Sequence, residues 1–198
     1  MKKFELTTEF ITNAFGKKLF RIKALVEFGD VKAGELGGYV EKEENVSQDG
    51  NAWVSGDARV YGNAWVHGNA KVYDDAWVSD NAKVFGNAWV RGNARVYGDA
   101  RVSGNAWVSG NARVSGNAWV YGDADYALVQ GFGTEFRCTT FYRGKNKKIM
   151  VNCGCFHGDL EGFRKQVKET RNGKIAKEYL MIADLMEYHF TSEDSSDE

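Results

Sequence analysis

Arginine and aromatic residues recur at intervals of eighteen residues in the middle of the chain. Six of them form one candidate set: Arg59, Trp77, Arg95 and Arg113, with Tyr61 and Tyr97 each placed two residues after an arginine. Guanidinium groups bind phosphate and carboxylate oxygens through paired hydrogen bonds, and they stack on aromatic rings. Tyrosine and tryptophan rings stack on planar ligands such as bases. If these side chains share one surface, it suits a small anionic ligand with a planar ring, such as a nucleotide.

The intervals come from a repeat of six residues. Twelve copies of Gly-Asn/Asp-Ala-X-Val-X run without insertion from Gly50 to Tyr121, and only Asp74 and Asp80 replace the leading glycine. On an extended chain the Ala and Val share one face and the two X residues share the other. Gly, Asn and Asp tolerate the left-handed backbone of a tight corner, so the aspartates are predicted to occupy the same corner. Corners that always turn the same way coil the chain, and each strand then pairs with the next coil.

The motif Val-X-X-Asn/Asp-Ala-X, as in residues 54–59, resembles the hexapeptide repeat of left-handed parallel β-helix proteins. The lead-in at residues 36–40, Leu-Gly-Gly-Tyr-Val, is similar to that of uncharacterised bacterial and phage hexapeptide-repeat proteins. The resemblance implies that three hexads close one triangular coil, which stacks residues eighteen apart on the same face. It also implies a homo-oligomer, most often a trimer. The fold itself does not transfer a function.

Three hexads to a coil divide the outward residues into three faces. The first face carries Trp53, Lys71, Trp89 and Trp107, the second carries Arg59, Trp77, Arg95 and Arg113, and the third carries Trp65, Lys83, Arg101 and Trp119. All six tryptophans are thus predicted to point away from the core. They either stack on Arg and Lys of neighbouring coils or lie between subunits. The tryptophans of the first face, Trp53, Trp89 and Trp107, are the candidates for self-association.

The flanking segments predict caps for the solenoid, because an open end would expose unpaired backbone groups. Residues 1–35 are predicted to hold a β-hairpin, with strands at 3–11 and 19–25, and residues 36–126 the β-helix, with Val40 and Val46 in the inward alanine position. Residues 127–191 are predicted as a ββαα unit, with strands at 136–142 and 149–155 and Asp159 as a helix N-cap. The acidic residues 192–198 are predicted to be disordered.

Catalytic chemistry has few candidates. An acyltransferase of this fold would use a histidine base beside coenzyme A, and His67 is the one histidine of the repeats. Cys138, Cys153, Cys155 and His157 superficially resemble zinc ligands, but same-face neighbours on a strand lie about 7 Å apart, too far for a shared zinc. With Cys138 predicted opposite Cys153, the thiols are interpreted as small, buried and reduced. No metal and no cofactor are predicted, and the sequence favours a protein that is not an enzyme.

Composition limits the partners. The net charge of −1 argues against general nucleic-acid binding, no apolar run is long enough to span a membrane, and the N-terminus lacks the apolar core of a signal peptide. Three cysteines without a secretion signal favour the cytoplasm. The hypothesis is a cytoplasmic oligomeric binding protein that captures a small anionic ligand or a host protein. The alternatives are an acyltransferase that uses coenzyme A and a purely structural or assembly module.

Overall fold

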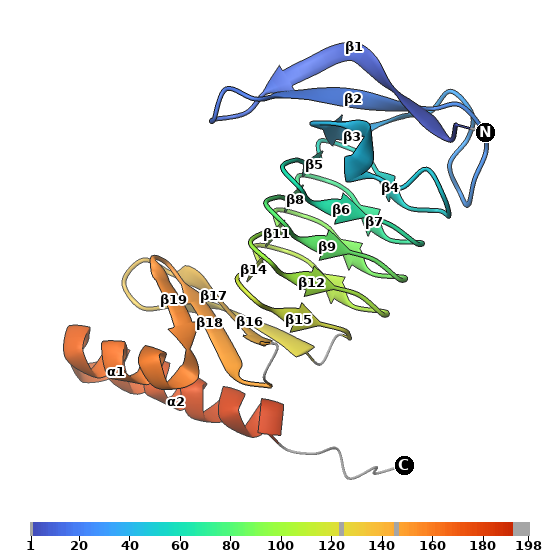
Figure 1. The fold of residues 1–198 in the computed structure, drawn as a ribbon. Helices are drawn as coiled ribbons and strands as arrows, with labels where there is room; N and C mark the ends of the chain where they lie inside the picture. Colours follow the sequence, from blue (N-terminus) through green and yellow to red (C-terminus); the bar gives the residue numbers. More distant parts are fainter. Residues whose placement is uncertain (1, 123–124, 145–146, 192–198) are drawn as a thin grey trace.

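The computed structural model describes residues 2–122, 125–144 and 147–191. A parallel β-solenoid forms the middle of the molecule, an antiparallel hairpin lies across its N-terminal end, and a small unit with two helices closes its C-terminal end (Figure 1). The predicted mainly-β solenoid fold is therefore confirmed. Within the described residues, no helix is long and apolar enough to cross a membrane.

Three parallel sheets of two-residue strands form the walls of the solenoid. The first contains β4 (Trp53–Val54), β7 (Lys71–Val72), β10 (Trp89–Val90) and β13 (Trp107–Val108). The second contains β5 (Arg59–Val60), β8 (Trp77–Val78), β11 (Arg95–Val96) and β14 (Arg113–Val114). The third contains β6 (Trp65–Val66), β9 (Lys83–Val84), β12 (Arg101–Val102) and β15 (Trp119–Val120). Paired residues differ by eighteen, so the predicted period and the three faces are confirmed.

The corners link successive coils as well as turning the chain. Asp74 and Asp80 adopt φ of 60° and 59°, like the glycines at the other corners. Their carboxylates accept hydrogen bonds from the backbone N–H groups of Gly92 and Gly98 on the next coil, each at 3.0 Å. The aspartates therefore tolerate the left-handed corner, as predicted, and add a contact between coils. Inside the corners the Ala and Val side chains stack in fully buried columns that form the core.

The N-terminal hairpin extends the second wall. Strands β1 (Phe4–Thr12) and β2 (Lys18–Ala24) pair antiparallel, β2 pairs with β3 (Leu36–Val40), and β3 pairs in parallel with β5. A short 3-10 turn, η1 (Glu43–Asn45), follows. Val40 and Val46 lie beside Val60 and Val66, so their predicted place in the alanine column is wrong. Gly38 takes the place beside Ala58, where a side chain would lie 2.7 Å from the Ala58 carbonyl oxygen.

Lys3, at the start of the N-terminal cap, is hydrogen-bonded to the first coil. Its ammonium donates to the carbonyls of Ala52 and Gly50 at 2.9 and 3.3 Å, and the residue is buried. Burial lowers the pKa of Lys3 to about 8, although the nearby Asp49 charge opposes this effect. A cation held in a water-poor site is disfavoured unless carbonyl oxygens replace its hydration shell. Lys3 therefore donates hydrogen bonds to the carbonyls of Gly50 and Ala52, and the loss of water around its charge opposes this gain.

This burial predicts a pH dependence of stability. Because the folded pKa of about 8 lies below the ordinary 10.5, the unfolded chain binds more protons between these two values. The free energy of unfolding should therefore rise with pH across this window, by at most about 3 kcal/mol, relative to a Lys3→Met variant. Urea denaturation of both proteins at several pH values measures the difference. Parallel curves for the two proteins would show that Lys3 has the same pKa in the folded and unfolded states.

Within residues 125–144 and 147–191, the C-terminal unit contains four antiparallel strands and two helices. The strands β16 (Tyr126–Phe132), β17 (Arg137–Arg143), β18 (Ile149–Cys153) and β19 (Phe156–Asp159) lie in sequence order. The prediction of two strands is therefore incomplete, because β16 and β19 contain glycines and polar residues that weaken their periodic pattern. Helices α1 (Leu160–Thr170) and α2 (Gly173–Thr191) follow. Asp159 caps α1 as predicted, by accepting from the Gly162 N–H at 2.9 Å. The acidic tail, residues 192–198, lies outside the described residues.

Polar side chains of this unit replace the missing next coil at β14. The Arg113 N–H donates to Thr140 Oγ1 at 3.0 Å, and the Arg113 carbonyl accepts from Asn152 Nδ2 at 2.9 Å. Asn152 Nδ2 also donates to Ser115 Oγ, and Asn152 Oδ1 lies 2.7 Å from His157 Nδ1. The side chain of Tyr142 is fully buried beside this group, and burial raises its pKa to about 12. The edge of the second wall is thus hydrogen-bonded by side chains rather than by another strand.

Candidate functional site

The second face of the solenoid holds a groove of about 270 Å³. It is lined by five of the six predicted ligand-binding residues, Tyr61, Trp77, Arg95, Tyr97 and Arg113, together with Phe15, Ser79, Asp80 and Val96. The eighteen-residue period explains this gathering, because β8, β11 and β14 lie side by side in one sheet. The sixth predicted residue, Arg59, lies on β5 and borders the group through its contact with Trp77.

Trp77 is held between two guanidinium groups. The Arg59 and Arg95 guanidinium carbons lie 5.1 and 4.5 Å from the centre of the Trp77 ring, from the coils before and after it. Each contact contributes roughly 0.5–1 kcal/mol at an exposed site. The stacking fixes the direction of both arginine side chains, and Arg95 lines the groove.

The arginines of this face carry charge that the chain itself does not neutralise. Within residues 2–122, 125–144 and 147–191, Arg59, Arg95 and Arg113 form no ion pair with a carboxylate, whereas Lys71 on the first face pairs with Asp30 at 2.7 Å. Asp80 lines the groove, but its carboxylate accepts from the Gly98 N–H. The groove therefore presents cations and aromatic rings together, in a geometry suited to an anion with a planar ring.

The hairpin supplies a residue that sequence reasoning missed. Phe15, in the turn between β1 and β2, lines the groove and is 78% exposed. Phe15 is distant in sequence from the repeats, and it belongs to no periodic pattern that would link it to them. The one local signal is the turn sequence at residues 13–17, which predicts an exposed loop but not the direction in which the loop projects.

The first face differs from its prediction at its N-terminal end. Trp53 is only 4% exposed, because the rings of Phe4 and Phe28 pack on it at 6.2 and 5.3 Å. Its predicted place at the surface is wrong, since the N-terminal cap covers this position. Trp89 and Trp107 remain partly exposed and meet edge to face at 5.4 Å, and the Arg91 guanidinium stacks on Trp107 at 4.3 Å. The interpretation that outward tryptophans stack on cations of neighbouring coils is confirmed here.

The third face places His67 in an aromatic stack. Its ring lies 3.9 Å from that of Trp65 and 5.0 Å from that of Phe85. Burial, reinforced by the charge of Lys83, lowers the pKa of His67 below its ordinary value. Within the described residues, its side chain makes no hydrogen bond with an acid or a nucleophile. The arrangement holds the imidazole between two aromatic rings.

The three cysteines differ from one another in burial and in their hydrogen bonds. Thr139, and not Cys138, lies opposite Cys153, and Cys138 instead donates to the Asn111 carbonyl at 3.4 Å. Cys138 and Cys153 are half-buried and Cys155 is exposed, so the prediction that all three thiols are buried is wrong. The predicted pairing of Cys138 with Cys153 is wrong by one residue in the strand register. Among the described residues, no group of three or more His, Cys, Asp or Glu side chains could hold a metal ion.

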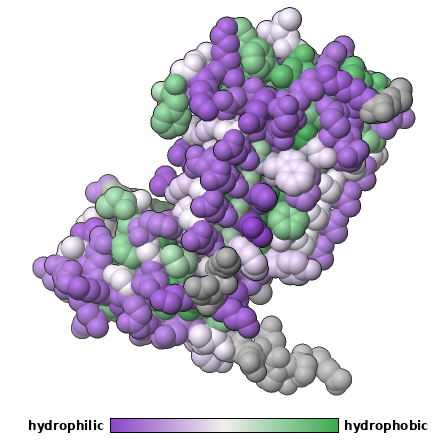
Figure 2. All heavy atoms as spheres, viewed as in Figure 1, coloured by the Kyte–Doolittle hydropathy of each residue, from purple (hydrophilic) through white to green (hydrophobic). Residues whose placement is uncertain are grey.

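Most of the visible solenoid surface is hydrophilic, and hydrophobic side chains gather near its two caps (Figure 2).

Comparison with protein families finds a similarity in the repeats. The family model of the YdcK beta-solenoid repeat matches residues 52–68, 94–110 and 106–122. The repeats of this chain are therefore similar to those of a β-solenoid family, in agreement with the three parallel walls. Comparison with curated proteins finds no match.

Proposed function

We propose that the chain is a non-enzymatic binding protein whose second face captures a small anionic ligand with a planar ring, of the nucleotide class. One observation carries the proposal: Trp77 lies between two arginines that have no carboxylate partner in the described residues, in a groove that Tyr97 and Arg113 also line. The similarity of the repeats to bacterial and phage hexapeptide-repeat proteins suggests such a source for the chain.

The groove can bind such a ligand through two kinds of contact. A planar ring would stack on the tyrosine rings of Tyr61 and Tyr97, which contributes about 1–3 kcal/mol for a base on an aromatic side chain. The phosphate or carboxylate would accept paired hydrogen bonds from Arg95 and Arg113, and such charge-assisted bonds are about twice as strong as neutral ones. Because Arg95 is already directed by stacking on Trp77, little of its side-chain entropy is lost on binding.

Calorimetric titration with ADP tests the proposal. Arg95→Ala should weaken ADP binding at least about thirtyfold, which corresponds to the loss of about 2 kcal/mol from charge-assisted hydrogen bonds. Arg101→Ala is the matched control, because Arg101 stacks on Trp119 at 5.2 Å on the third face and should bind ADP like the unaltered protein. Circular dichroism spectra of all three should agree. Equal binding by Arg95→Ala and the unaltered protein would contradict the proposal.

Two other functions predict different results. An acyltransferase would bind coenzyme A and lose turnover on His67→Ala, whereas the stacked geometry of His67 supports no such role. A host protein bound at the same face would co-purify with the unaltered chain but not with the Arg95→Ala variant. A purely structural or assembly module would bind neither ADP nor coenzyme A.

The first face supports a proposal of self-association, with a trimer as the expected form. Trp89 and Trp107 leave 37% and 39% of their surface exposed, and large aromatic rings of this kind are enriched at protein interfaces. Light scattering should give the mass of an oligomer for the unaltered protein and of a monomer for a Trp89→Ser, Trp107→Ser variant. Trp119→Ser on the third face is the control. A monomeric unaltered protein would refute this interface.

A further inference from the structure

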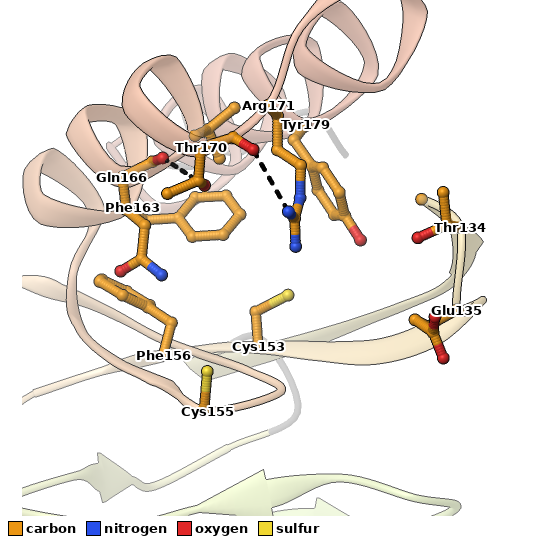
Figure 3. A pocket seen from close by; sticks show the side chains of 12 residues that line it. Thr134, Glu135, Cys153, Cys155, Phe156, Phe163, Gln166, Thr170, Arg171 and Tyr179 are labelled. Carbon is orange, nitrogen blue, oxygen red and sulfur yellow. Dashed lines mark hydrogen bonds between the residues drawn. The ribbon is translucent and has the colours of Figure 1, made fainter.

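A second cavity lies in the C-terminal unit, away from the solenoid faces (Figure 3). Its walls come from the turn between β16 and β17, the end of β18 and the start of β19, helix α1 with the residue after it, and Tyr179 of α2. The cavity volume is about 70 Å³. One buried water needs roughly 10–15 Å³ by this measure, so there is room for a molecule as large as several waters.

Aromatic rings form the apolar wall of the cavity. The ring of Phe163 lies 5.6 Å from that of Phe156 and meets that of Tyr179 edge to face at 5.9 Å. Tyr179 is fixed at its far end, since its hydroxyl donates to the Phe132 carbonyl at 3.1 Å. Val167 adds a buried methyl surface on the same side. A branched or aromatic side chain of a ligand would replace water against this wall.

The polar lining includes a cation without an acidic partner. Figure 3 shows the Arg171 side chain directed into the cavity, and its one hydrogen bond in the described residues goes to the neighbouring Thr170 carbonyl at 3.3 Å. By contrast, Arg164 on α1 pairs with both Asp184 and Glu187 at 2.7 Å. The side-chain amide of Gln166 also lines the cavity and makes no described hydrogen bond. These groups suit a carboxylate.

A second charge lines the cavity and has the opposite sign. Glu135 comes from the turn between β16 and β17, and it forms no ion pair among the described residues. Arg171 and Glu135 do not pair with each other either, although both border the same small space. Two opposite charges that do not pair with each other, beside an apolar wall, fit a ligand that carries both charges itself. A carboxylate alone would bind Arg171 but would be repelled by Glu135.

We propose that this cavity binds a free apolar α-amino acid. Its carboxylate would pair with Arg171 and Gln166, its ammonium group with Glu135, and its side chain would pack on Phe156, Phe163 and Val167. The thiol of Cys153, half-buried and hydrogen-bonded to Thr139 at 3.1 Å, lies in the wall and would be covered by the ligand. The site is separate from the second face, so the two proposals can fail independently.

Titration of the full chain with L-leucine tests the site. We expect a Kd of about 1 mM or tighter, and binding at least about tenfold weaker for Arg171→Gln and for Glu135→Gln. Lys168→Gln is the matched control, because Lys168 lies in the last turn of α1 and does not line the cavity. Arg95→Ala should bind leucine normally. Absence of leucine binding at about 10 mM, or unchanged binding by Arg171→Gln, would overturn the proposal.

Two ligand analogues test the recognition of both charges. 4-Methylpentanoate lacks the ammonium group of leucine, and isopentylamine lacks its carboxylate, so each should bind at least about tenfold more weakly. Equal binding of 4-methylpentanoate and leucine would overturn the assignment of Glu135. Leucine should also slow alkylation of Cys153 by iodoacetamide, as measured by mass spectrometry, while leaving Cys138 unaffected. Unchanged alkylation of Cys153 at saturating leucine would place leucine elsewhere and overturn the proposal.

Discussion

Replacing Val90 with aspartate is expected to unfold the solenoid. The Val90 side chain is fully buried, and it lies between Val72 and Val108 of the neighbouring coils. Burying a carboxylate without a partner costs several kcal/mol, while a whole domain is stable by only about 5–15 kcal/mol. Each coil pairs only with its two neighbours, so disrupting the coil that contains Val90 also weakens the coils on both sides of it. Circular dichroism and solubility after expression measure the effect.

The next residue provides the control for this substitution. Arg91→Asp places the same carboxylate on the outward face, where it removes one cation–π contact with Trp107 and should lower stability by about 1 kcal/mol or less. A Val90→Asp protein that remains soluble, with the spectrum and thermal midpoint of Arg91→Asp, would contradict the position of Val90 in the core.

The second large effect is expected at the C-terminal cap. Asn152→Leu keeps the size of the side chain but removes the donor to the Arg113 carbonyl and to Ser115, and the oxygen beside His157. A buried group left without its partner costs about 1–3 kcal/mol, and this substitution leaves more than one. The cap should therefore detach more readily from β14. Limited proteolysis should release the C-terminal unit faster, and the thermal midpoint should fall.

An exposed asparagine serves as the reference. Asn105 continues a ladder in which Asn87 Nδ2 donates to Asn105 Oδ1 at 3.2 Å on the solenoid surface. Asn105→Ala should change stability by about 0.5 kcal/mol or less, as is usual for surface substitutions. If Asn152→Leu and Asn105→Ala show the same proteolysis rate, Asn152 does not hold the cap on the last coil.

The solenoid is predictable from the sequence because one local rule is repeated. Every hexad has a small residue and a valine two apart and a corner that accepts positive φ, so the period fixes which residues face inward. The period also places Trp77 between Arg59 and Arg95 before any coordinates are known. The side chains that stack on each of the three walls can thus be predicted from the eighteen-residue period, provided that no insertion shifts it.

The caps are less predictable because they depend on contacts between distant segments. Trp53 occupies an outward position by its period, yet Phe4 and Phe28 cover it, and nothing near Trp53 in the sequence signals this. Phe15 reaches the second-face groove for the same kind of reason. The place of Val40 is decided by Gly38 beside Ala58 and not by the hexad pattern, which is degenerate there. The binding of any ligand at the groove stays a prediction.

Hydroxyl-radical footprinting with and without ADP tests the central claim most directly, because it reports the exposure of individual aromatic side chains by mass spectrometry. The proposed site predicts that ADP protects Trp77, Tyr61 and Tyr97 on the second face. It also predicts unchanged oxidation of Trp107 on the first face and of Trp119 on the third. Protection of Trp107 or Trp119 without protection of Trp77, or no protection at saturating ADP, would contradict the assignment of the second face.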